Sequence, residues 1–193
     1  MPSSARSEGG YEVEVDVALL ILLAAGFLLG VLRGAVRQLI VIGTWLVAFI
    51  IAAYLRPVVG DWIASNAADY SREHVEMLAF LGSFLVLFTL AVVVIEIGGT
   101  TVQLTQRVAL DEILGGFLAL GATILVIGSL AVIFDTYYAA NPSLATSELD
   151  IARQLNAAFD RSAIIRAMHD SLIPGLMALL GPVLPADIRA VYP

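Results

Sequence analysis

The sequence predicts an all-α membrane protein, with four transmembrane helices in a bundle followed by a C-terminal amphipathic helical tail. The 193 residues are 60% hydrophobic, with a mean hydropathy of +0.92. Only 14% of them are charged, whereas about a quarter are charged in a soluble domain. Uncharged stretches occupy residues 17–32, 38–55, 77–95 and 113–134. They are apolar on all sides, unlike the alternating strands of a membrane β-barrel, so we expect helices.

The lengths of these stretches agree with four membrane spans. A helix needs about 20 apolar residues to cross the hydrocarbon, with about 17 as the lower limit. The third and fourth stretches meet this length, and the first two are extended by Val13, Val15 and the aliphatic stem of Arg33, which can reach the interface. We therefore expect a transmembrane domain over 15–138, with helices at about 16–32, 36–55, 74–97 and 112–136.

Turn and capping residues separate the expected helices. The acidic tail 1–14 is expected to be disordered. A turn at Arg33–Gly34 makes the first two helices an antiparallel hairpin, and Arg56–Pro57 is expected to stop the second helix and open a loop. The third helix should end at Gly98–Gly99, before a polar connector, and Asp111 should cap the fourth helix.

The tail, residues 139–193, differs in composition from the membrane domain. Ser147 and Asp150 have the spacing of a capping box. We expect two short amphipathic helices before Pro174, while the apolar segment 176–180 is too short to span. The tail should lie on the membrane surface, or pack against the bundle or a partner. Its apolar stripe consists of Ile151, Leu155, Phe159, Ile165, Met168 and Leu172.

The residues give little support to catalysis or cofactor binding. There are no cysteines, which excludes disulfides and thiolate metal sites, and no basic tract for nucleic acid. Adjacent residues in the run His169–Asp170–Ser171 point about 100° apart on a helix and cannot converge as a triad. No nucleophile elbow, phosphate-binding loop or zinc pattern occurs. We expect no catalytic, cofactor-binding or metal residues and no enzyme activity.

Glycines recur every four residues along the first helix, at Gly26, Gly30 and Gly34. Small residues at this spacing line one helix face and let another backbone approach closely. The fourth helix offers Gly115 and Ala119 as partners. The pattern predicts tight helix packing, either within one chain or between two chains.

A few charged residues near the expected helix ends are candidates for functional roles. Arg33 and Arg37 should face water as topology determinants, or else contact lipid headgroups or an anionic ligand. Glu96, Arg107 and Asp111 form a candidate intramembrane polar site. Because Glu96 lies at the end of its apolar run, we favour an interfacial contact over a role in ion movement.

Two short motifs resemble the colicin V production protein (CvpA) family. The first is Asp16 at the start of helix one, with the run 30–37, Gly-Val-Leu-Arg-Gly-Ala-Val-Arg, ahead of helix two. The second is the run 111–115, Asp-Glu-Ile-Leu-Gly, at the start of helix four. The chain departs from the family pattern at Glu112, commonly basic, and at Ala119, commonly glycine. The resemblance covers roughly residues 15–138.

The resemblance implies a bacterial inner-membrane protein tied to toxin production or secretion and to envelope maintenance. We expect a non-enzymatic scaffold or accessory factor that contacts the bilayer and an unidentified membrane or envelope protein, or a second copy of itself. The alternative is a small transporter or channel subunit, with Glu96 and the polar connector lining a path; a third reading is a bare membrane anchor. Some relatives carry a periplasmic protease after this domain, and we expect it to be absent here.

The orientation in the membrane is expected from the resemblance. Four spans place both termini on one side. We expect this side to be the outside, because acids precede helix one and the arginines Arg33 and Arg37 follow it. The arginine count alone does not settle the direction, and acids contribute little to orientation.

Overall fold

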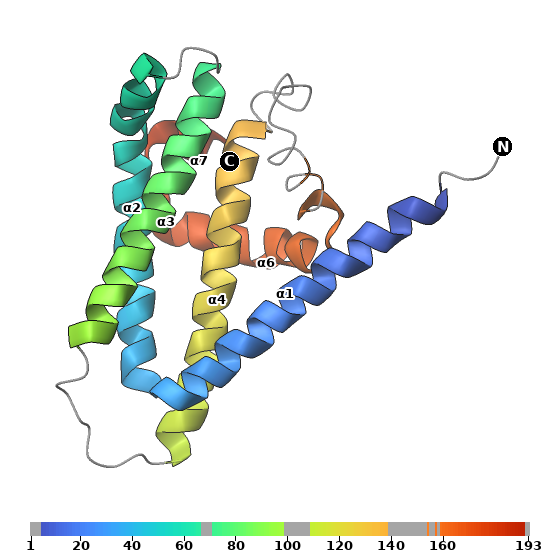
Figure 1. Ribbon diagram of the computed structural model, residues 1–193, viewed down its shortest axis with the longest axis vertical. Helices are drawn as coiled ribbons and strands as arrows, with labels where there is room; N and C mark the ends of the chain where they lie inside the picture. The colour runs from blue at the N-terminus through green and yellow to red at the C-terminus, as the bar shows by residue number, and fades with distance from the viewer. Residues whose placement is uncertain are drawn as a thin grey trace.

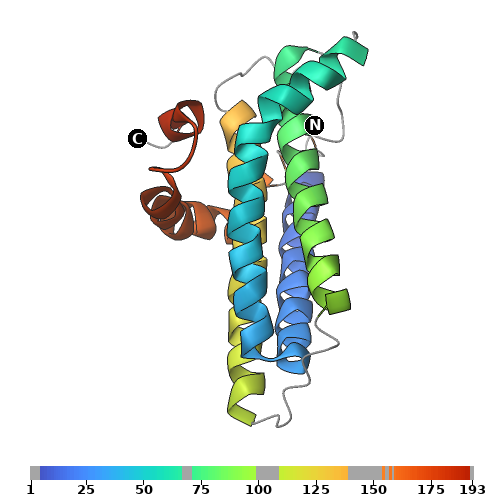
Figure 2. The ribbon, with the colours of Figure 1, turned by 90° about the vertical axis from the view of Figure 1, so that its left-hand side faces the viewer.

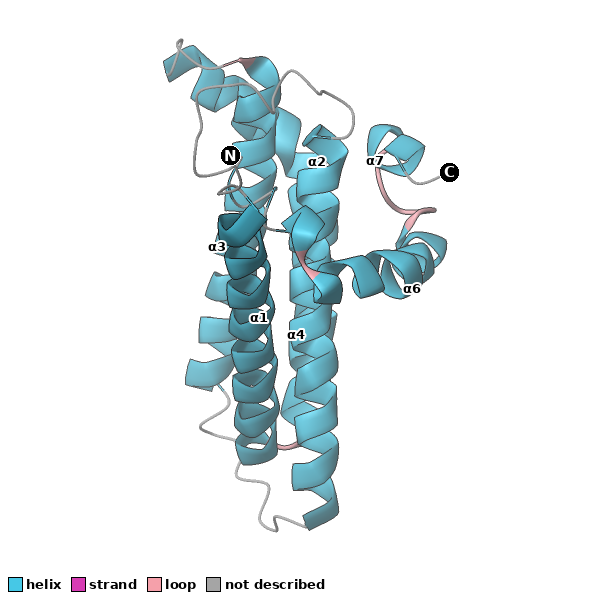
Figure 3. Ribbon diagram, turned by 90° about the vertical axis from the view of Figure 1, so that its right-hand side faces the viewer, coloured by secondary structure: helices cyan, strands magenta, loops and turns pink. Residues whose placement is uncertain are grey.

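The computed structural model describes residues 5–66, 71–98, 109–138, 154, 157 and 159–191. That part of the chain is helical and contains no strand. Four long helices form an elongated bundle, and a shorter helix, α6, lies across it (Figures 1 and 3). The helices are α1 (Ala5–Arg33), α2 (Ala35–Asn66), α3 (Arg72–Gly98), α4 (Ala109–Tyr138), α6 (Ala163–Leu180) and α7 (Ala186–Val191).

Five of these helices are long and apolar enough to cross a membrane: α1 from Val15, α2, α3 from His74, α4 and α6. The fifth is α6, which we had expected to be part of a non-spanning tail. The helical class and the multi-pass membrane character predicted from the sequence are confirmed. The predicted number of four spans is not, because α6 also meets the criteria of length and composition.

The helices do not pair in the order of the sequence. After the turn at Gly34, α1 and α2 diverge, and α1 packs chiefly along α4 (Figure 1). The main neighbour of α2 is α3, and α4 also packs against α2. Figure 2 shows α2 and α3 side by side, with α6 and α7 to one side of the bundle. The expected hairpin of the first two helices is therefore a turn between helices that have different principal partners.

Aromatic side chains fill the space between α2 and α3. Trp45 stacks on Phe49 with ring centroids 6.0 Å apart, and Phe49 lies 5.5 Å from Phe80 and 5.7 Å from Phe84. All four are buried. The indole Nε1 of Trp45 donates a hydrogen bond of 2.8 Å to Ser129 Oγ on α4, so its polar group is satisfied inside the bundle.

The prediction that Arg56–Pro57 ends the second helix is wrong, since α2 continues through Pro57 to Asn66. A proline in a helix removes one backbone hydrogen bond and clashes with the preceding turn. Contacts on both sides of Pro57 offset this cost: Arg56 is buried, and Gly60 packs against Glu76 and Ala79 of α3. The beginning of α1 also differs from the prediction, because the helix starts at Ala5 within the tail expected to be disordered.

Of the two short helices predicted in the tail, the first lies mostly outside the described residues, although residues 154, 157 and 159–161 are helical, and the second is longer than predicted. Ser162 caps α6 by accepting a hydrogen bond of 3.1 Å from the backbone N–H of Ile165, and the helix continues past Pro174 to Leu180. Its buried face contains Ile165, Met168, Ile173, Leu176 and Leu180. Ser147, Asp150, Ile151 and Leu155 lie outside the described residues.

Candidate functional site: the charged end of the bundle

The structure brings the glycines of α1 against α4. A Cβ at Gly26 would collide with Thr123 Oγ1, and one at Gly30 would collide with Ala119 Cβ and the Gly115 carbonyl. A Cβ at Gly115 would in turn lie 2.6 Å from the carbonyl oxygen of Gly30. We call this contact the α1–α4 seam; it is the close backbone approach that small residues permit in membrane helices. It consists of Gly26, Gly30, Gly34, Gly115, Ala119 and Thr123.

At the end of the seam, Asp111 contacts the turn between α1 and α2. Gly34 has φ +83°, a left-handed conformation that favours glycine. Asp111 Oδ1 accepts a hydrogen bond of 3.1 Å from the backbone N–H of Ala35, the first residue of α2. The expectation that Asp111 caps its own helix is wrong, because α4 begins two residues earlier, at Ala109. Asp111 instead caps α2, so the two sequence motifs meet here.

Beside this turn, Glu96 of α3 forms ion pairs with two arginines. Its Oε1 lies 3.2 Å from Arg33 Nη2, and its Oε2 lies 2.9 Å from Arg37 Nη2. Arg37 Nη2 also donates to the Glu96 carbonyl at 3.4 Å. We call these three residues the Glu96 cluster. It joins α1, α2 and α3 at the end of the bundle where Asp111 joins α2 to α4.

The Glu96 cluster differs from the predicted polar site in its members. Arg107, expected near Glu96, lies outside the described residues. About a third of each side chain in the cluster is exposed (29–35%), which suits an interface better than the centre of a bilayer. Both arginines neutralise Glu96, so the group is arranged to hold helix ends together. The described residues contain no group of three His, Cys, Asp or Glu that could hold a metal.

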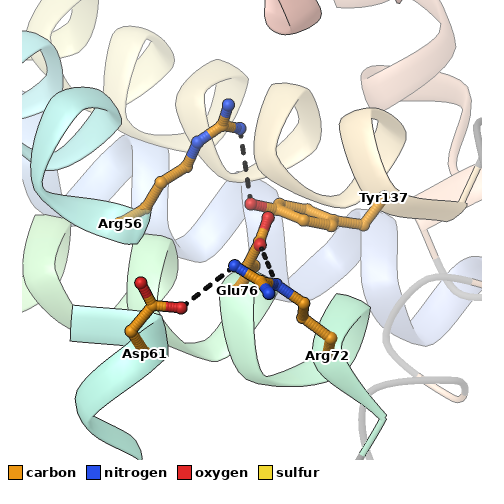
Figure 4. Close-up of polar contacts among 5 residues, drawn as sticks. All are labelled: Arg56, Asp61, Arg72, Glu76 and Tyr137. Atoms are coloured by element: carbon orange, nitrogen blue, oxygen red, sulfur yellow. Dashed lines mark hydrogen bonds and ion pairs between the residues drawn. The ribbon is translucent and has the colours of Figure 1, made fainter. Parts of the chain in front are cut away.

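Figure 4 shows a second polar group, formed by residues of α2, α3 and α4. Arg56 Nη1 donates to Tyr137 Oη at 3.4 Å, and its guanidinium lies 5.8 Å from the centre of the Phe80 ring. Nearby, Arg72 forms ion pairs with Asp61 at 3.0 Å and Glu76 at 3.2 Å. We call this the Arg56 cluster (Arg56, Asp61, Arg72, Glu76 and Tyr137).

Sequence reasoning missed the Arg56 cluster because it placed Arg56 in a loop. One local signal was available: Arg72 and Glu76 have the spacing of an ion pair on one helix face. The contact of Arg56 with Tyr137 joins residues 81 positions apart, and nothing in the local sequence indicates it.

The fold and its two polar clusters define a multi-pass α-helical membrane protein, whose helix ends carry ion pairs and whose interior is packed with apolar side chains. The family model described as Colicin V production protein matches residues 15–171, and the chain belongs to this family. A colicin V production protein homolog of Haemophilus influenzae is 27% identical over 127 residues, which cover 64% of this chain and 74% of the relative. No solved structure matches. The family match includes the first half of α6, beyond the region of the motifs.

Proposed function

We propose that this chain is a non-enzymatic scaffold of the bacterial inner membrane. It positions or stabilises a partner protein in toxin production or export, and contributes to maintenance of the envelope. Membership of the Colicin V production protein family supports the link to toxin production. In this proposal both termini lie outside the cytoplasm, as the acids in the first part of α1 and the arginines at and after its end suggest.

The observation that carries the proposal is the aromatic packing between α2 and α3, beside which the ionic side chains form contacts with one another or with aromatic groups. A path for ions or polar solutes needs polar side chains at successive depths. Between the Glu96 cluster and the Arg56 cluster, the space between α2 and α3 is filled by Trp45, Phe49, Phe80 and Phe84. Glu96, the acid that the transporter alternative would use, is held by two guanidinium groups. This arrangement favours a scaffold with a packed interior rather than a transporter.

The outer surface of α1 and α3 offers the area that a partner within the membrane would need. Leu28 of α1 is 62% exposed and Val86 of α3 is 64% exposed. Because α1 packs chiefly on α4, most of its remaining surface is open to lipid or to another helix. The partner is accordingly a membrane protein, or a second copy of this chain.

Ion flux tests the scaffold against the alternative of a transporter or channel subunit. The purified chain is placed in phosphatidylethanolamine–phosphatidylglycerol vesicles with trapped proton and potassium indicators. The scaffold proposal predicts flux equal to that of empty vesicles for the wild type and for Glu96→Gln. Flux above this level that Glu96→Gln removes would replace the scaffold with a conducting function.

Photo-crosslinking in the producing cell tests whether a partner exists. A photoreactive residue is placed at Leu28, Val86 or Phe117, exposed positions on α1, α3 and α4. The proposal predicts a reproducible protein adduct from at least one helix, at a size that identifies either a foreign partner or a second copy. If none of the three positions gives a protein adduct, the chain is a bare membrane anchor.

A further inference from the structure

The helix α6 has the length and composition of a marginal membrane span. Its 18 residues correspond to about 27 Å at 1.5 Å per residue, while the hydrocarbon core is about 30 Å thick. Arg166, His169 and Asp170 lie in its first half. The imidazole Nε2 of His169 lies 3.2 Å from Asp135 Oδ2. Whether α6 crosses the membrane or lies along its boundary depends on where its two ends are attached to the bundle.

Asp16 of α1 holds the N-terminal end of α6. Its Oδ1 accepts a hydrogen bond of 2.5 Å from Ser162 Oγ and one of 3.5 Å from the backbone N–H of Ile164. Its Oδ2 accepts from the N–H of Ala163 at 3.3 Å. A carboxylate at a helix N-terminus satisfies backbone donors and interacts favourably with the helix dipole. The start of α6 is therefore tied to the level of Asp16.

Tyr54 of α2 holds the other end. Its hydroxyl donates a hydrogen bond of 2.7 Å to the carbonyl oxygen of Val183, three residues after α6 ends. The end of α6 is therefore tied to the level of Tyr54.

Both attachment points lie the same number of residues along their helices from the Glu96 cluster. Arg33 and Arg37 bind the same carboxylate of Glu96 and so mark one level. Asp16 precedes Arg33 by 17 residues (33 − 16), and Tyr54 follows Arg37 by 17 residues (54 − 37). Each separation is about 26 Å along its own helix, and α1 runs obliquely to α2 (Figure 1). A spanning helix would run along α4, whereas Figures 1 and 3 show α6 crossing α4.

Exposed side chains on opposite sides of α6 differ in character. Leu172 and Leu176 pack toward Gly128 of α4. Asp170 and Leu179 are nine residues apart, or about 900° at 100° per residue, so they point in opposite directions. Both are exposed, and Leu179 is 68% exposed.

We propose that α6 is an interfacial helix lying in the plane of the membrane boundary, with Leu179 in the acyl region of the lipid and Asp170 facing water. Along α2, about 26 Å separate the level of the Glu96 cluster from Tyr54, which places the end of α6 at the far side of a hydrocarbon core about 30 Å thick. Amphipathic helices of this kind lie about 5–10 Å into the boundary between headgroups and acyl chains. The partner of this surface is lipid, and the inference does not depend on the scaffold proposal.

Site-directed spin labelling tests the placement, and the sequence is suited to it because it has no native cysteine. Single-cysteine variants at Ala167, Asp170, Ala178 and Leu179 are labelled in phosphatidylethanolamine–phosphatidylglycerol vesicles. Collisions with oxygen, which concentrates in lipid, are compared with collisions with a water-soluble nickel complex. Ala25→Cys is the mid-span reference, because Ala25 is exposed and lies nine residues from Asp16 and eight from Arg33. Melting temperatures of the labelled variants check that each is folded.

The Leu179 label should favour oxygen over nickel several-fold, and the Asp170 label should show the reverse preference. Ala167 and Ala178 are both exposed and lie on nearly the same face, because 11 residues correspond to about 1,100°. Their labels should report equal depth, shallower than Ala25. A depth difference of about 16 Å, the rise of 11 residues, would make α6 a fifth span. A Leu179 label that prefers nickel, or is shielded from both reagents, would mean that water or a protein occupies the face assigned to lipid.

Discussion

Single glycines of α1 determine how closely that helix approaches α4. Gly30 has no space for a Cβ, since Ala119 Cβ and the carbonyl of Gly115 occupy that position. Gly43 of α2 offers a matched contrast, because nothing lies within 4 Å of the position its Cβ would take. The same substitution therefore tests close packing at one site and helix propensity alone at the other.

Gly30→Ala should destabilise the protein in detergent by about 1–3 kcal/mol, the usual cost of overpacking a tight contact. Gly43→Ala should be neutral or stabilising by about 0.5–1 kcal/mol, because alanine is the better helix former. Thermal unfolding of both variants measures the difference. Equal stability of the two variants would show that the α1–α4 seam is not a close contact.

Asp111 stabilises the fold through one hydrogen bond, which it accepts from the first residue of α2. Asp111→Ala should lower stability by about 1 kcal/mol, as loss of a helix cap does, whereas Asp111→Asn should retain most of it because the amide oxygen can still accept from Ala35 N–H. Glu112→Ala is the neighbouring control. If alanine and asparagine at position 111 were equivalent, the hydrogen bond at 3.1 Å would not contribute to stability.

At the scale of elements, the tail is held to the bundle by separate contacts along its length. Before α6, Phe159 packs edge-on against Phe134 of α4 with centroids 5.5 Å apart. At its start, Asp16 caps α6, and beyond its end Tyr54 binds Val183. A helix of this length is marginal in water by itself, so these contacts account for its order.

Phe159→Asp should release the segment before α6 to protease in permeabilised membrane vesicles, because it replaces an aromatic contact worth about 0.5–1.5 kcal/mol with a charge. The helices α1 to α4 should remain intact. Arg161→Ala, at an exposed position, is the control and should be cleaved at the wild-type rate. Unchanged protection of Phe159→Asp would show that this side chain does not dock the tail.

The docking of the tail should also depend on pH through Asp160. Burial raises the pKa of Asp160 above its ordinary 3.8, the nearby carboxylate of Asp135 adds to this rise, and His169 opposes it. The folded state thus binds more protons than the unfolded state between the ordinary and the raised pKa, and stability falls as the pH rises through this window. Asp160→Asn should be more stable than the wild type at neutral pH.

The difference should shrink as the pH falls below 3.8, because Asp160 then becomes largely protonated in the unfolded state as well as in the folded state. Thermal unfolding at pH 3.5 and pH 7 measures it. A difference that is the same at both pH values would show that protonation of Asp160 is not its cause.

For the whole molecule, the number of spans decides where the two termini lie. Reporter fusions at residue 145, between α4 and α6, and after Pro193 should report the same side, because an interfacial α6 does not cross the bilayer. Our proposed orientation predicts active alkaline phosphatase and a dark fluorescent protein at both points. Opposite results at the two points would make α6 a span, and two bright fluorescent fusions would reverse the orientation.

The sequence by itself determined the helical membrane class and the family. Four apolar runs are local properties of the chain, and the bilayer obliges each run to satisfy its own backbone hydrogen bonds by forming a helix. The spacing of Gly26, Gly30 and Gly34 likewise indicated a face suited to close packing. These inferences depend on residues near one another in the chain.

Only the tertiary structure decided which helices pair and what the charged residues contact. Asp111 reaches Ala35 across 76 positions, and Glu96 reaches Arg37 across 59. The continuation of α2 past Pro57 also depends on distant residues. Contacts with α3 and α4 offset the free-energy cost of a proline inside a helix. The crosswise placement of α6 follows from the distant residues Asp16 and Tyr54. Local pattern determines which segments are helical, whereas their arrangement depends on packing and hydrogen bonds between residues far apart in the chain.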